Sequence, residues 1–396
     1  MIETIESTEL HRLLADDYSM ADVKEISPFV SDDVRNTADN ERSSNDALNL
    51  NLSGGTIFDV KCAYDRFILK VFSPKQPQAQ CVLEASLLDW LKQNGFAEVP
   101  TVVRTKYGAL LGSLPQPLSE RKCMLLERIS FSRALTWVSS DSTEQDCAAA
   151  GAFLARLHGK LAEVPYSMLR DWHLDKEKPP SSVGNDGVIG VASVRPYLSS
   201  WLDEIFDRVD RGEGVLSESL RRQVLAARDS IFSVAEEAES LLNSCADLTQ
   251  MLVHGDFHPG NLIWSEGNVA GVVDFENAHY EHPAYDLAYA AITFSANWRE
   301  PFSSGAVQTI SANQFPTPFQ IENARAFVRA YAKNSDLISA EELEALLPAY
   351  VMLTGAVIIM WVIHSSLTTN RFYGQLLFLI NNVHLLKDLG SRFLGR

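Results

Sequence analysis

One short polar segment constrains this chain more than any other feature. It reads His-Gly-Asp-Phe-His-Pro-Gly-Asn at residues 254–261, and Val-Asp-Phe follows at residues 273–275. Two short strand-like runs separate Asn261 from Asp274, and a strand, a turn and a second strand would bring these two side chains together. Asn and Asp oxygens are hard ligands that suit Mg²⁺. The segment therefore predicts a metal site at Asn261 and Asp274, with Asp256 left free beside it.

This arrangement matches the needs of phosphoryl transfer from ATP. Such a reaction requires a carboxylate that receives or orients the acceptor hydroxyl, oxygen ligands for Mg²⁺, and a cation that holds the phosphates. Asp256 is the predicted catalytic carboxylate. His254, two residues upstream, is expected to pack and hydrogen-bond within the loop. The segment thus supplies the first two requirements.

Three other interpretations compete with this one. A polar loop between two strands would explain Asp256 alone. A metal hydrolase could use His254, Asp256 and His258 with help from His279 and His282, but these residues match no standard zinc spacing. A P-loop would need GxxxxGK[ST], which occurs nowhere in the chain. The combination HxDxxxxN with a DF pair thirteen residues later favours a kinase-type site.

A lysine upstream is the candidate for the missing cation, and a glutamate is its expected partner. Lys70 ends the run Phe-Ile-Leu-Lys in a predicted strand, where it is expected to hold the phosphates. A lone lysine there would ordinarily be a solvated strand residue. Glu84 lies fourteen residues on, at the inner face of the next predicted helix. An ion pair between Lys70 and Glu84 would keep the lysine in position.

Backbone groups complete the predicted nucleotide site. Gly54 and Gly55 occupy a predicted hairpin turn where main-chain amides could approach phosphates, although a Gly-Gly pair is also a common turn. The run 123–129 indicates an apolar strand that meets a polar junction. Adenine is expected to hydrogen-bond there to the backbone of Glu127 and Ile129.

The chain changes character near residue 130. The predicted elements before it are a helix at 9–20, a polar loop near 31–46, strands at 48–52, 56–63, 66–72, 101–104 and 122–126, and a helix at 78–94. The predicted elements after it are helices at 147–158, 194–208 and 218–242, with short strands around 262–264 and 269–273. This pattern predicts an α+β protein of two lobes, a small β-rich N-lobe (1–129) and a larger, mainly helical C-lobe (130–396).

One apolar run is long enough to cross a membrane. Residues 346–363 contain no charged side chain, and their length reaches the usual threshold for a membrane span. Pro348, Thr354 and Gly355 interrupt the run, and neither flank is basic. These features favour a helix buried on all sides in the large lobe, and we expect no membrane association.

Net charge and cysteine content limit the classes of binding partner and the cellular compartment that we expect. The net charge of -17 disfavours binding to nucleic acid or anionic lipid, and it favours either a cationic substrate or simple solubility. The N-terminus has neither the basic flank nor the apolar run of a signal peptide. The cysteines are scattered, without metal-binding or disulfide spacing, at Cys62, Cys81, Cys123, Cys147 and Cys245. A cytoplasmic protein with free thiols is the expectation.

Several motifs resemble one known family. HGDFHPGN at 254–261, GVVDFENA at 271–278, PAYDLA at 283–288 and FLARLH at 153–158 look like the aminoglycoside phosphotransferase/choline kinase group, which includes homoserine, fructosamine and methylthioribose kinases. The resemblance extends from about residue 48 through 291.

By resemblance the chain has the protein-kinase-like fold, with ATP and Mg²⁺ bound between the lobes. The resemblance also implies the site roles: Asp256 is the catalytic base, Asn261 and Asp274 bind Mg²⁺, and Lys70 pairs with Glu84. Asp286 is similar to a carboxylate that supports the catalytic loop.

The acceptor is expected to be a small molecule. The catalytic loop lacks the arginine of protein kinases, and an amino alcohol, an amino sugar or aminoglycoside, or a hydroxyamino acid such as homoserine is favoured. Its ammonium group could meet acidic residues, namely Glu276, Glu281 and Asp203 or Glu204, unless these form a solvated face or pair with arginines. A helical insert at 160–248, with Trp172 and Trp201, is expected to shape the pocket. The alternative is a catalytically silent nucleotide-binding regulator on the same fold, which the intact site residues disfavour.

Overall fold

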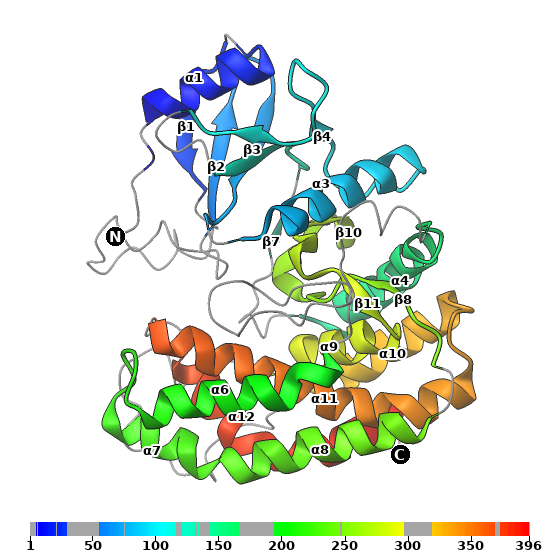
Figure 1. Cartoon of the computed structure of the whole chain (residues 1–396). Coiled ribbons are helices and arrows are strands. Elements are labelled where there is room, and N and C mark those ends of the chain that lie inside the picture. The colour runs from blue at the N-terminus through cyan, green and yellow to red at the C-terminus, as the bar shows by residue number, and fades with distance from the viewer. Residues whose placement is uncertain are drawn as a thin grey trace.

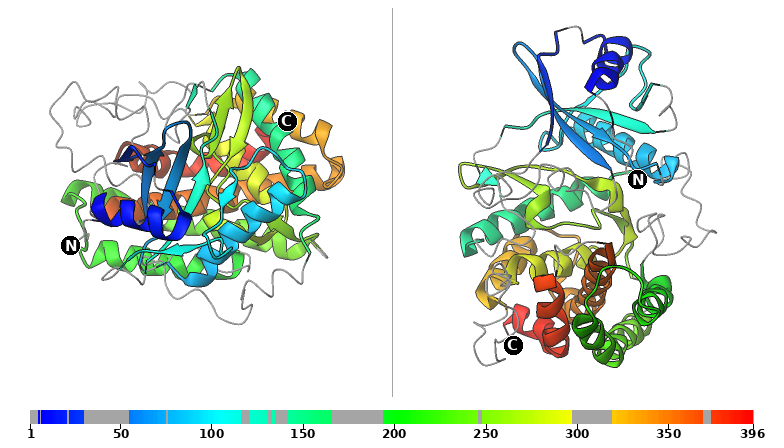
Figure 2. Two further views of the ribbon diagram at one scale, coloured as in Figure 1. Left: turned by 90° about the horizontal axis from the view of Figure 1, so that it is seen from above. Right: turned by 90° about the vertical axis from the view of Figure 1, so that its left-hand side faces the viewer.

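The computed structural model describes residues 5, 7–20, 22–29, 55–74, 76–115, 121–130, 133–134, 142–165, 194–245, 248–296, 319–368 and 373–395. A sheet with two helices forms the N-terminal part, and a larger group of helices forms the C-terminal part below it (Figure 1). The same division is visible in the side view of Figure 2. This is the α+β arrangement predicted from the sequence, while the domain division at residue 129 stays a prediction.

The N-terminal part is built on one antiparallel sheet. Its elements are α1 (Ser7–Tyr18), β1 (Glu25–Pro28), β2 (Thr56–Lys61), β3 (Arg66–Val71), α3 (Gln78–Gln93), β4 (Val102–Val103), β5 (Gly112–Ser113) and β6 (Lys122–Glu127). The strand order is β1-β2-β3-β6-β4, and β5 also pairs with β6. The predicted β2–β3 hairpin and the predicted helix over 78–94 are confirmed.

The two faces of this sheet carry different groups of side chains. Leu69 and Val71 of β3 belong to the apolar cluster that α1 covers with Leu10, Leu13 and Leu14. Successive residues of a strand point to opposite faces. Lys70 therefore points to the other face, toward α3, where it meets Glu84. The alternation of a single strand thus separates the apolar side of the sheet from the charged site.

The C-terminal part contains short strands above a group of helices. The elements nearest the sheet are β7 (Arg133–Ala134), α4 (Glu144–Leu161), β8 (Met251–Val253), η3 (Pro259–Asn261), β9 (Leu262–Ser265), β10 (Asn268–Val272), η4 (Phe275–Asn277) and β11 (His279–Glu281). The remaining elements are η2 (Arg195–Tyr197), α6 (Leu198–Asp210), α7 (Glu218–Ala226), α8 (Arg228–Ser244), α9 (Ala284–Ser295), α10 (Ile321–Asn334), α11 (Ala340–Thr368), α12 (Tyr373–Asn382), η7 (Val383–Leu385) and α13 (Leu386–Leu394). The strands form the sheets β10-β9-β7 and β11-β8, which lie where the two parts meet (Figure 1).

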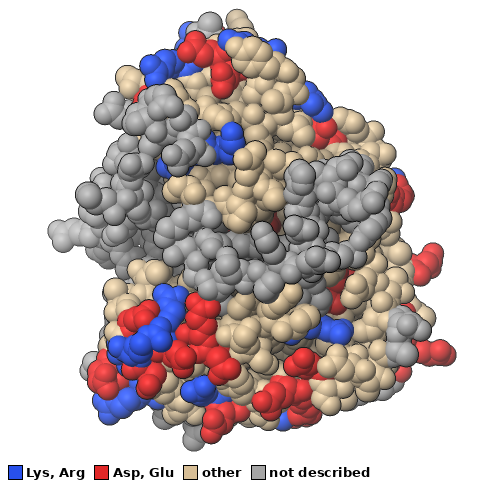
Figure 3. All heavy atoms as spheres, in the orientation of Figure 1, with Lys and Arg blue, Asp and Glu red and all other residues tan. Residues whose placement is uncertain are grey.

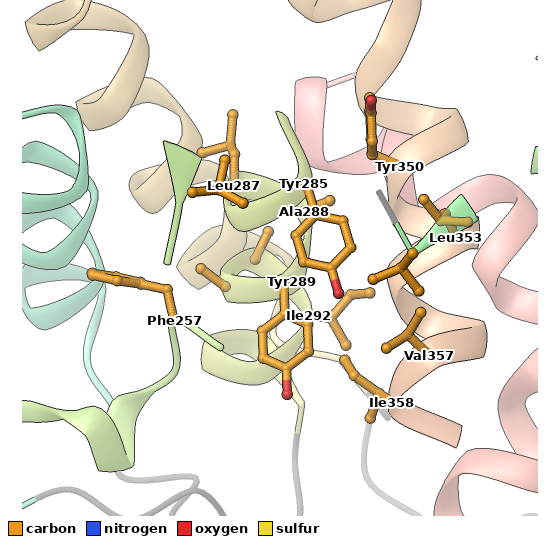
Figure 4. Packing of buried hydrophobic residues seen from close by; sticks show 14 of the residues in the cluster. Phe257, Tyr285, Leu287, Ala288, Tyr289, Ile292, Tyr350, Leu353, Val357 and Ile358 are labelled. Atoms are coloured by element: carbon orange, nitrogen blue, oxygen red, sulfur yellow. The ribbon is translucent and has the colours of Figure 1, made fainter. Parts of the chain in front are cut away.

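Two helices form the centre of the lower core. Every residue of α9 is buried, and α9 packs against α11, as Figure 4 shows for Ile292 of α9 and Val357 of α11. By length and composition alone α11 could cross a membrane, and 89% of its most apolar window is buried inside the protein. Helix α11 contains the run 346–363, so the expectation of a buried core helix agrees with the packing.

Some predicted elements differ from the structure. The helix predicted over 218–242 is wrong as a single element, because α7 ends at Ala226 and α8 begins at Arg228. Strands β1, β5, β7, β8 and β11 were not predicted; β5 and β7 have two residues and β8 and β11 have three, too short for a clear alternation. The predicted strand at 48–52 and the polar loop near 31–46 lie outside the described residues.

Candidate active site

Asp286 fixes the backbone of the loop that carries Asp256. The amides of His254 and Gly255 donate to Asp286 Oδ2 and Oδ1 at 2.7 and 2.8 Å. His158 of α4 donates to the same carboxylate at 3.0 Å. Burial alone would raise the pKa of Asp286, but the bond from His158 and the nearby imidazoles hold that pKa below its usual value. Asp286 thus supports the loop structurally, as its resemblance implied.

A glycine is required beside the predicted catalytic residue. Gly255 has a φ of 81°, in the left-handed region that favours glycine. A Cβ at this position would lie 2.0 Å from the carbonyl oxygen of Asn277. The close approach of Gly255 to the chain around Asn277 therefore determines how tightly the loop packs against the segment that follows Asp274.

His254 joins the two halves of the motif. Its Nδ1 accepts from the amide of Asp256 at 3.3 Å, so Nε2 carries the proton and donates to the carbonyl of Val273 at 3.1 Å. Burial lowers the pKa of His254, which favours this neutral form. The imidazole therefore connects the Asp256 loop to the residue before Asp274, within the loop as the sequence predicted.

Two side chains that the sequence analysis did not connect with Asp256 donate hydrogen bonds to its carboxylate. Tyr289 of α9 donates its hydroxyl to Asp256 Oδ1 at 2.7 Å, and Asn261 Nδ2 donates to Oδ2 at 3.2 Å. His258 Nε2 lies 3.5 Å from Oδ2. The side chain of Asp256 still exposes 21% of its surface. The carboxylate is thus held on both oxygens and remains reachable.

The hairpin of β9 and β10 brings Asn261 and Asp274 together. The amide of Val273 donates to the carbonyl of Asn261 at 3.0 Å, which joins the two ends of the hairpin. Asn261 Nδ2 donates to the carbonyl and the carboxylate of Asp256, so the side-chain oxygen of Asn261 is the atom left for a cation. Asp274 has a φ of 69°, a left-handed conformation that Asp adopts more readily than most residues. The hairpin therefore places the backbone of Asn261 beside the residue that precedes Asp274, and the metal-binding roles stay predictions.

Lys70 is surrounded by three carboxylates. Its Nζ donates to both oxygens of Glu84 at 2.9 Å, to Asp274 Oδ1 at 2.7 Å and to Glu276 Oε2 at 3.3 Å. Only 5% of Lys70 is exposed. Burial alone would lower the pKa of Lys70, but the three negative charges raise it well above its usual value. The Lys70–Glu84 contact predicted from the sequence is therefore present, as part of a larger group that we call the lysine cluster (Lys70, Glu84, Asp274 and Glu276).

Glu276 accepts a hydrogen bond from Lys70, which corrects its interpretation as an ammonium ligand for the acceptor. It follows Asp274 in the turn η4, which packs against α3. Gln80 of α3 donates to the main-chain carbonyl of Glu276 at 2.7 Å. Burial raises the pKa of the Glu276 carboxyl to about 8, and the charge of Asp274 adds to this shift. Glu84, Asp274 and Glu276 offer oxygens within 4.8 Å of one another, a spacing that could hold a metal ion.

The predicted nucleotide-backbone contacts are only partly described. Gly54 lies outside the described residues, and Gly55 is buried just before β2. The amide of Glu127 donates to the carbonyl of Thr101 at 2.9 Å, so this N–H is not available to adenine. Ile129 is half-buried and packs against Gly271 of β10, where a Cβ would lie 2.6 Å from Ile129 Cδ1. The adenine contacts stay a prediction.

The other acidic residues predicted near the acceptor have different partners. Glu281 is fully buried and accepts from Tyr350 and from the amide of His282, each at 2.9 Å. Asp203 of α6 pairs with Arg228 at 2.9 Å. Charges of both signs lie side by side over the lower left of the molecule in Figure 3, where Figure 1 shows α6 and α7. The ammonium role is therefore wrong for Glu281, and Asp203 fits the arginine-paired alternative.

The helical insert contributes one buried tryptophan among the described residues. Trp201 of α6 is 5% exposed and stacks on Tyr197 with ring centroids 5.8 Å apart. Trp172 lies outside the described residues. Trp201 thus packs within the helical part, and its predicted role in shaping the acceptor pocket stays a prediction.

Solved structures with the same fold cover almost the whole chain. Spectinomycin phosphotransferase in complex with ADP and spectinomycin is 14% identical with a TM-score of 0.59, and the match covers 98% of this chain and 100% of that one. A microcompartment-associated aminopropanol kinase is 18% identical with a TM-score of 0.58 and 98% coverage of both chains. Amicoumacin kinase in complex with AMP-PNP and Ca²⁺ is 15% identical with a TM-score of 0.53, covering 83% of this chain and 85% of that one.

The family itself is identified by sequence. No curated protein matches the chain. The sequence model of the phosphotransferase enzyme family (APH) matches residues 50–331, which include β2, the lysine cluster, the Asp256 loop and α9. The chain, a phosphotransferase that acts on alcohol groups, belongs to the phosphotransferase enzyme family.

Proposed function

We propose that the protein transfers the γ-phosphoryl group of ATP, bound with Mg²⁺, to a hydroxyl group of a small molecule. One observation carries this proposal. Lys70 of β3, Glu84 of α3 and Asp274 converge through hydrogen bonds, and the Val273–Asn261 bond joins this cluster to the loop of Asp256. A phosphate-holding cation, hard oxygen ligands and a carboxylate for the acceptor are the parts that phosphoryl transfer requires.

The charges of the site fit a divalent cation. Three carboxylates surround one ammonium in the lysine cluster, which leaves negative charge that a cation would offset. Asp274 and Asn261 supply carboxylate and amide oxygens, the ligand types that Mg²⁺ prefers. When bound, the ion would neutralise charge on the phosphate oxygens. Lys70 would then hold the phosphates while Glu84 keeps the lysine in place.

Asp256 would act on the acceptor. Its carboxylate is partly exposed and is held on both oxygens. A hydroxyl that hydrogen-bonds to it would be oriented toward the phosphoryl group. Asp256 would receive the proton as the new P–O bond forms, while the bond from the γ-phosphorus to the bridging oxygen breaks and ADP leaves. Such positioning of the acceptor contributes much of the rate enhancement of phosphotransferases.

An amino alcohol or amino sugar is the acceptor class that we propose. Two of the similar structures are a spectinomycin phosphotransferase and an aminopropanol kinase, and both of these acceptors carry amino and hydroxyl groups. The net charge of -17 favours a cationic acceptor through long-range attraction. A hydroxyamino acid such as homoserine is the next class to examine.

The test is ADP release from magnesium-ATP with a panel of amino alcohols, aminoglycosides, sugars and homoserine. We expect at least one amino compound to stimulate ADP release, and Asp256→Ala to abolish the stimulation. Tight ATP binding without turnover on any acceptor would instead support the silent regulator. Absence of both ATP binding and turnover would contradict the kinase function and the regulator function alike.

A further inference from the structure

One tyrosine of the buried helix α9 reaches the proposed catalytic carboxylate. Tyr289 is 6% exposed and donates its hydroxyl to Asp256 Oδ1 at 2.7 Å. Tyr285 lies one turn earlier on the same helix, and Figure 4 shows both rings projecting from α9. The two rings stack with centroids 6.4 Å apart and planes 16° from parallel. Packing in the core therefore fixes the direction of the Tyr289 hydroxyl.

The bond from Tyr289 gives the Asp256 carboxylate a donor on its second oxygen. Asn261 Nδ2 binds Oδ2 at a longer distance, 3.2 Å, and this bond alone leaves the carboxylate able to rotate. A second donor on Oδ1 fixes the plane of the group. A carboxylate can accept about four hydrogen bonds, so a position on Oδ1 beside the phenol remains for a hydroxyl. The 21% exposure of the Asp256 side chain leaves this position reachable.

We propose that Tyr289 is a positioning residue, which holds the Asp256 carboxylate in the orientation that receives the acceptor hydroxyl. The inference rests on the proposed function, because it assigns Asp256 the role of base. Tyr289 acts through Asp256, and its hydroxyl keeps its own proton throughout. The short contact joins two rigid elements: α9, and the loop that Asp286 anchors to the start of the same helix.

The chain offers a matched control for the phenol. Tyr285 is 1% exposed and lies on the same helix, where its ring packs edge-on against His279. Tyr285→Phe and Tyr289→Phe each remove one buried phenol oxygen from α9. Only the second change removes a hydrogen bond to Asp256. A difference between the two variants therefore isolates that bond from the general effect of a lost hydroxyl.

The experiment uses the full chain with magnesium-ATP and water as the acceptor, so that no acceptor has to be known. Measured quantities are kcat, KM for ATP, the melting temperature and binding of AMP-PNP. We expect Tyr289→Phe to lower kcat roughly ten- to a hundred-fold, the usual range for a bond to a charged group, while KM stays within about two-fold. Tyr285→Phe should leave kcat within about two-fold of wild type.

Three other results would overturn the role of Tyr289, and a fourth would overturn the proposed function. An unchanged or increased kcat in Tyr289→Phe overturns the inference, and an increase would mean that the phenol competes with the acceptor. Lost AMP-PNP binding, or an equal loss of kcat in both variants, would make Tyr289 a folding contact and overturn it as well. If wild type releases no more ADP than Asp256→Asn, with water or with any acceptor of the panel, the proposed function itself fails.

Discussion

The lysine cluster and the Asp256 loop are the two halves of the site, and they are held together in different ways. Lys70 is held by charged partners, with side chains 6% exposed for Lys70 and 2% for Glu84. Asp256 is held by the neutral donors Tyr289 and Asn261 and is 21% exposed. Removing one member of a buried ion pair leaves an uncompensated charge, whereas removing a neutral donor mainly frees a side chain.

This difference predicts which property each half controls. Substitutions in the lysine cluster should change the stability of the fold together with nucleotide binding. Substitutions at Asp256 should change turnover and leave the fold intact.

Asp256→Asn should produce the largest effect on rate. Asparagine keeps the shape of the side chain but cannot receive the acceptor proton. We expect kcat to fall by about a thousand-fold or more. Steady-state ADP release measures kcat, and thermal unfolding should show a melting temperature within about 3 °C of wild type. A stability loss as large as that of Lys70→Met would show that Asp256, too, is a main support of the fold.

Lys70→Met should produce the largest effect on stability. It leaves Glu84, Asp274 and Glu276 without their buried cation. Loss of one partner from a buried ion pair typically lowers the free energy of unfolding by about 3–5 kcal/mol. Urea unfolding measures this change. The matched control is Lys122→Met, on the neighbouring strand β6, because Lys122 donates to the neutral hydroxyl of Ser113.

Lys122→Met should cost under about 1 kcal/mol, the usual range for a partly exposed polar contact. Adding Glu84→Gln to Lys70→Met removes one of the uncompensated charges and should recover part of the lost stability. Equal losses in Lys70→Met and Lys122→Met would show that the cluster is not held by charge balance.

Gly255→Ala should damage the Asp256 half through the backbone. Its φ of 81° strains any other residue, and a Cβ would also lie 2.0 Å from the carbonyl oxygen of Asn277. We expect a loss of about 3 kcal/mol in unfolding free energy, from strain and displacement together. Gly267→Ala, in the β9–β10 turn, has a φ of 79° but no atom within 4 Å of the added Cβ.

Gly267→Ala therefore reports the strain alone, about 1 kcal/mol. Denaturant unfolding of both variants separates the two contributions. Equal losses of unfolding free energy in the two variants would show that the close approach to Asn277 does not contribute to stability. The loop would then adjust around an added methyl group.

Local spacing made one part of the site predictable. Asp256, Asn261 and Asp274 lie within a single loop and hairpin, so short-range geometry determines their neighbourhood. The contact between Lys70 and Glu84 also follows from adjacent elements, a strand and the helix after it. In each case few alternative arrangements of the chain exist.

Tyr289 and Glu276 could not be placed in the same way. Tyr289 belongs to a helix buried on every side, so its apolar sequence has no pattern that marks the face toward Asp256. Its contact depends on the direction of α9 after Asp286 is fixed. Glu276 turns back toward Lys70 because Asp274 adopts a left-handed conformation, which the sequence does not specify. The break between α7 and α8 at Ala227 likewise lacks Gly or Pro as a signal.

The smallest expected effect concerns the pH dependence of the lysine cluster. Burial raises the pKa of the Glu276 carboxyl to about 8 in the folded protein, well above the value of about 4.3 in an unfolded chain. The folded state therefore binds a proton more tightly than the unfolded state. The resulting stability is present below about pH 4 and is lost as the pH rises toward 8.

Glu276→Gln removes this titration, since its amide stays neutral at every pH. The ligand-free variant should therefore gain stability relative to wild type as the pH rises from 5 to 8, by roughly 1–2 kcal/mol after allowance for the attraction of Lys70. Urea unfolding at several pH values measures the difference. Asp203→Asn, at an exposed ion pair with Arg228, should show no such trend. A difference between Glu276→Gln and wild type that stayed constant with pH would mean that Lys70 keeps Glu276 ionised, so the cluster would carry more negative charge than burial suggests.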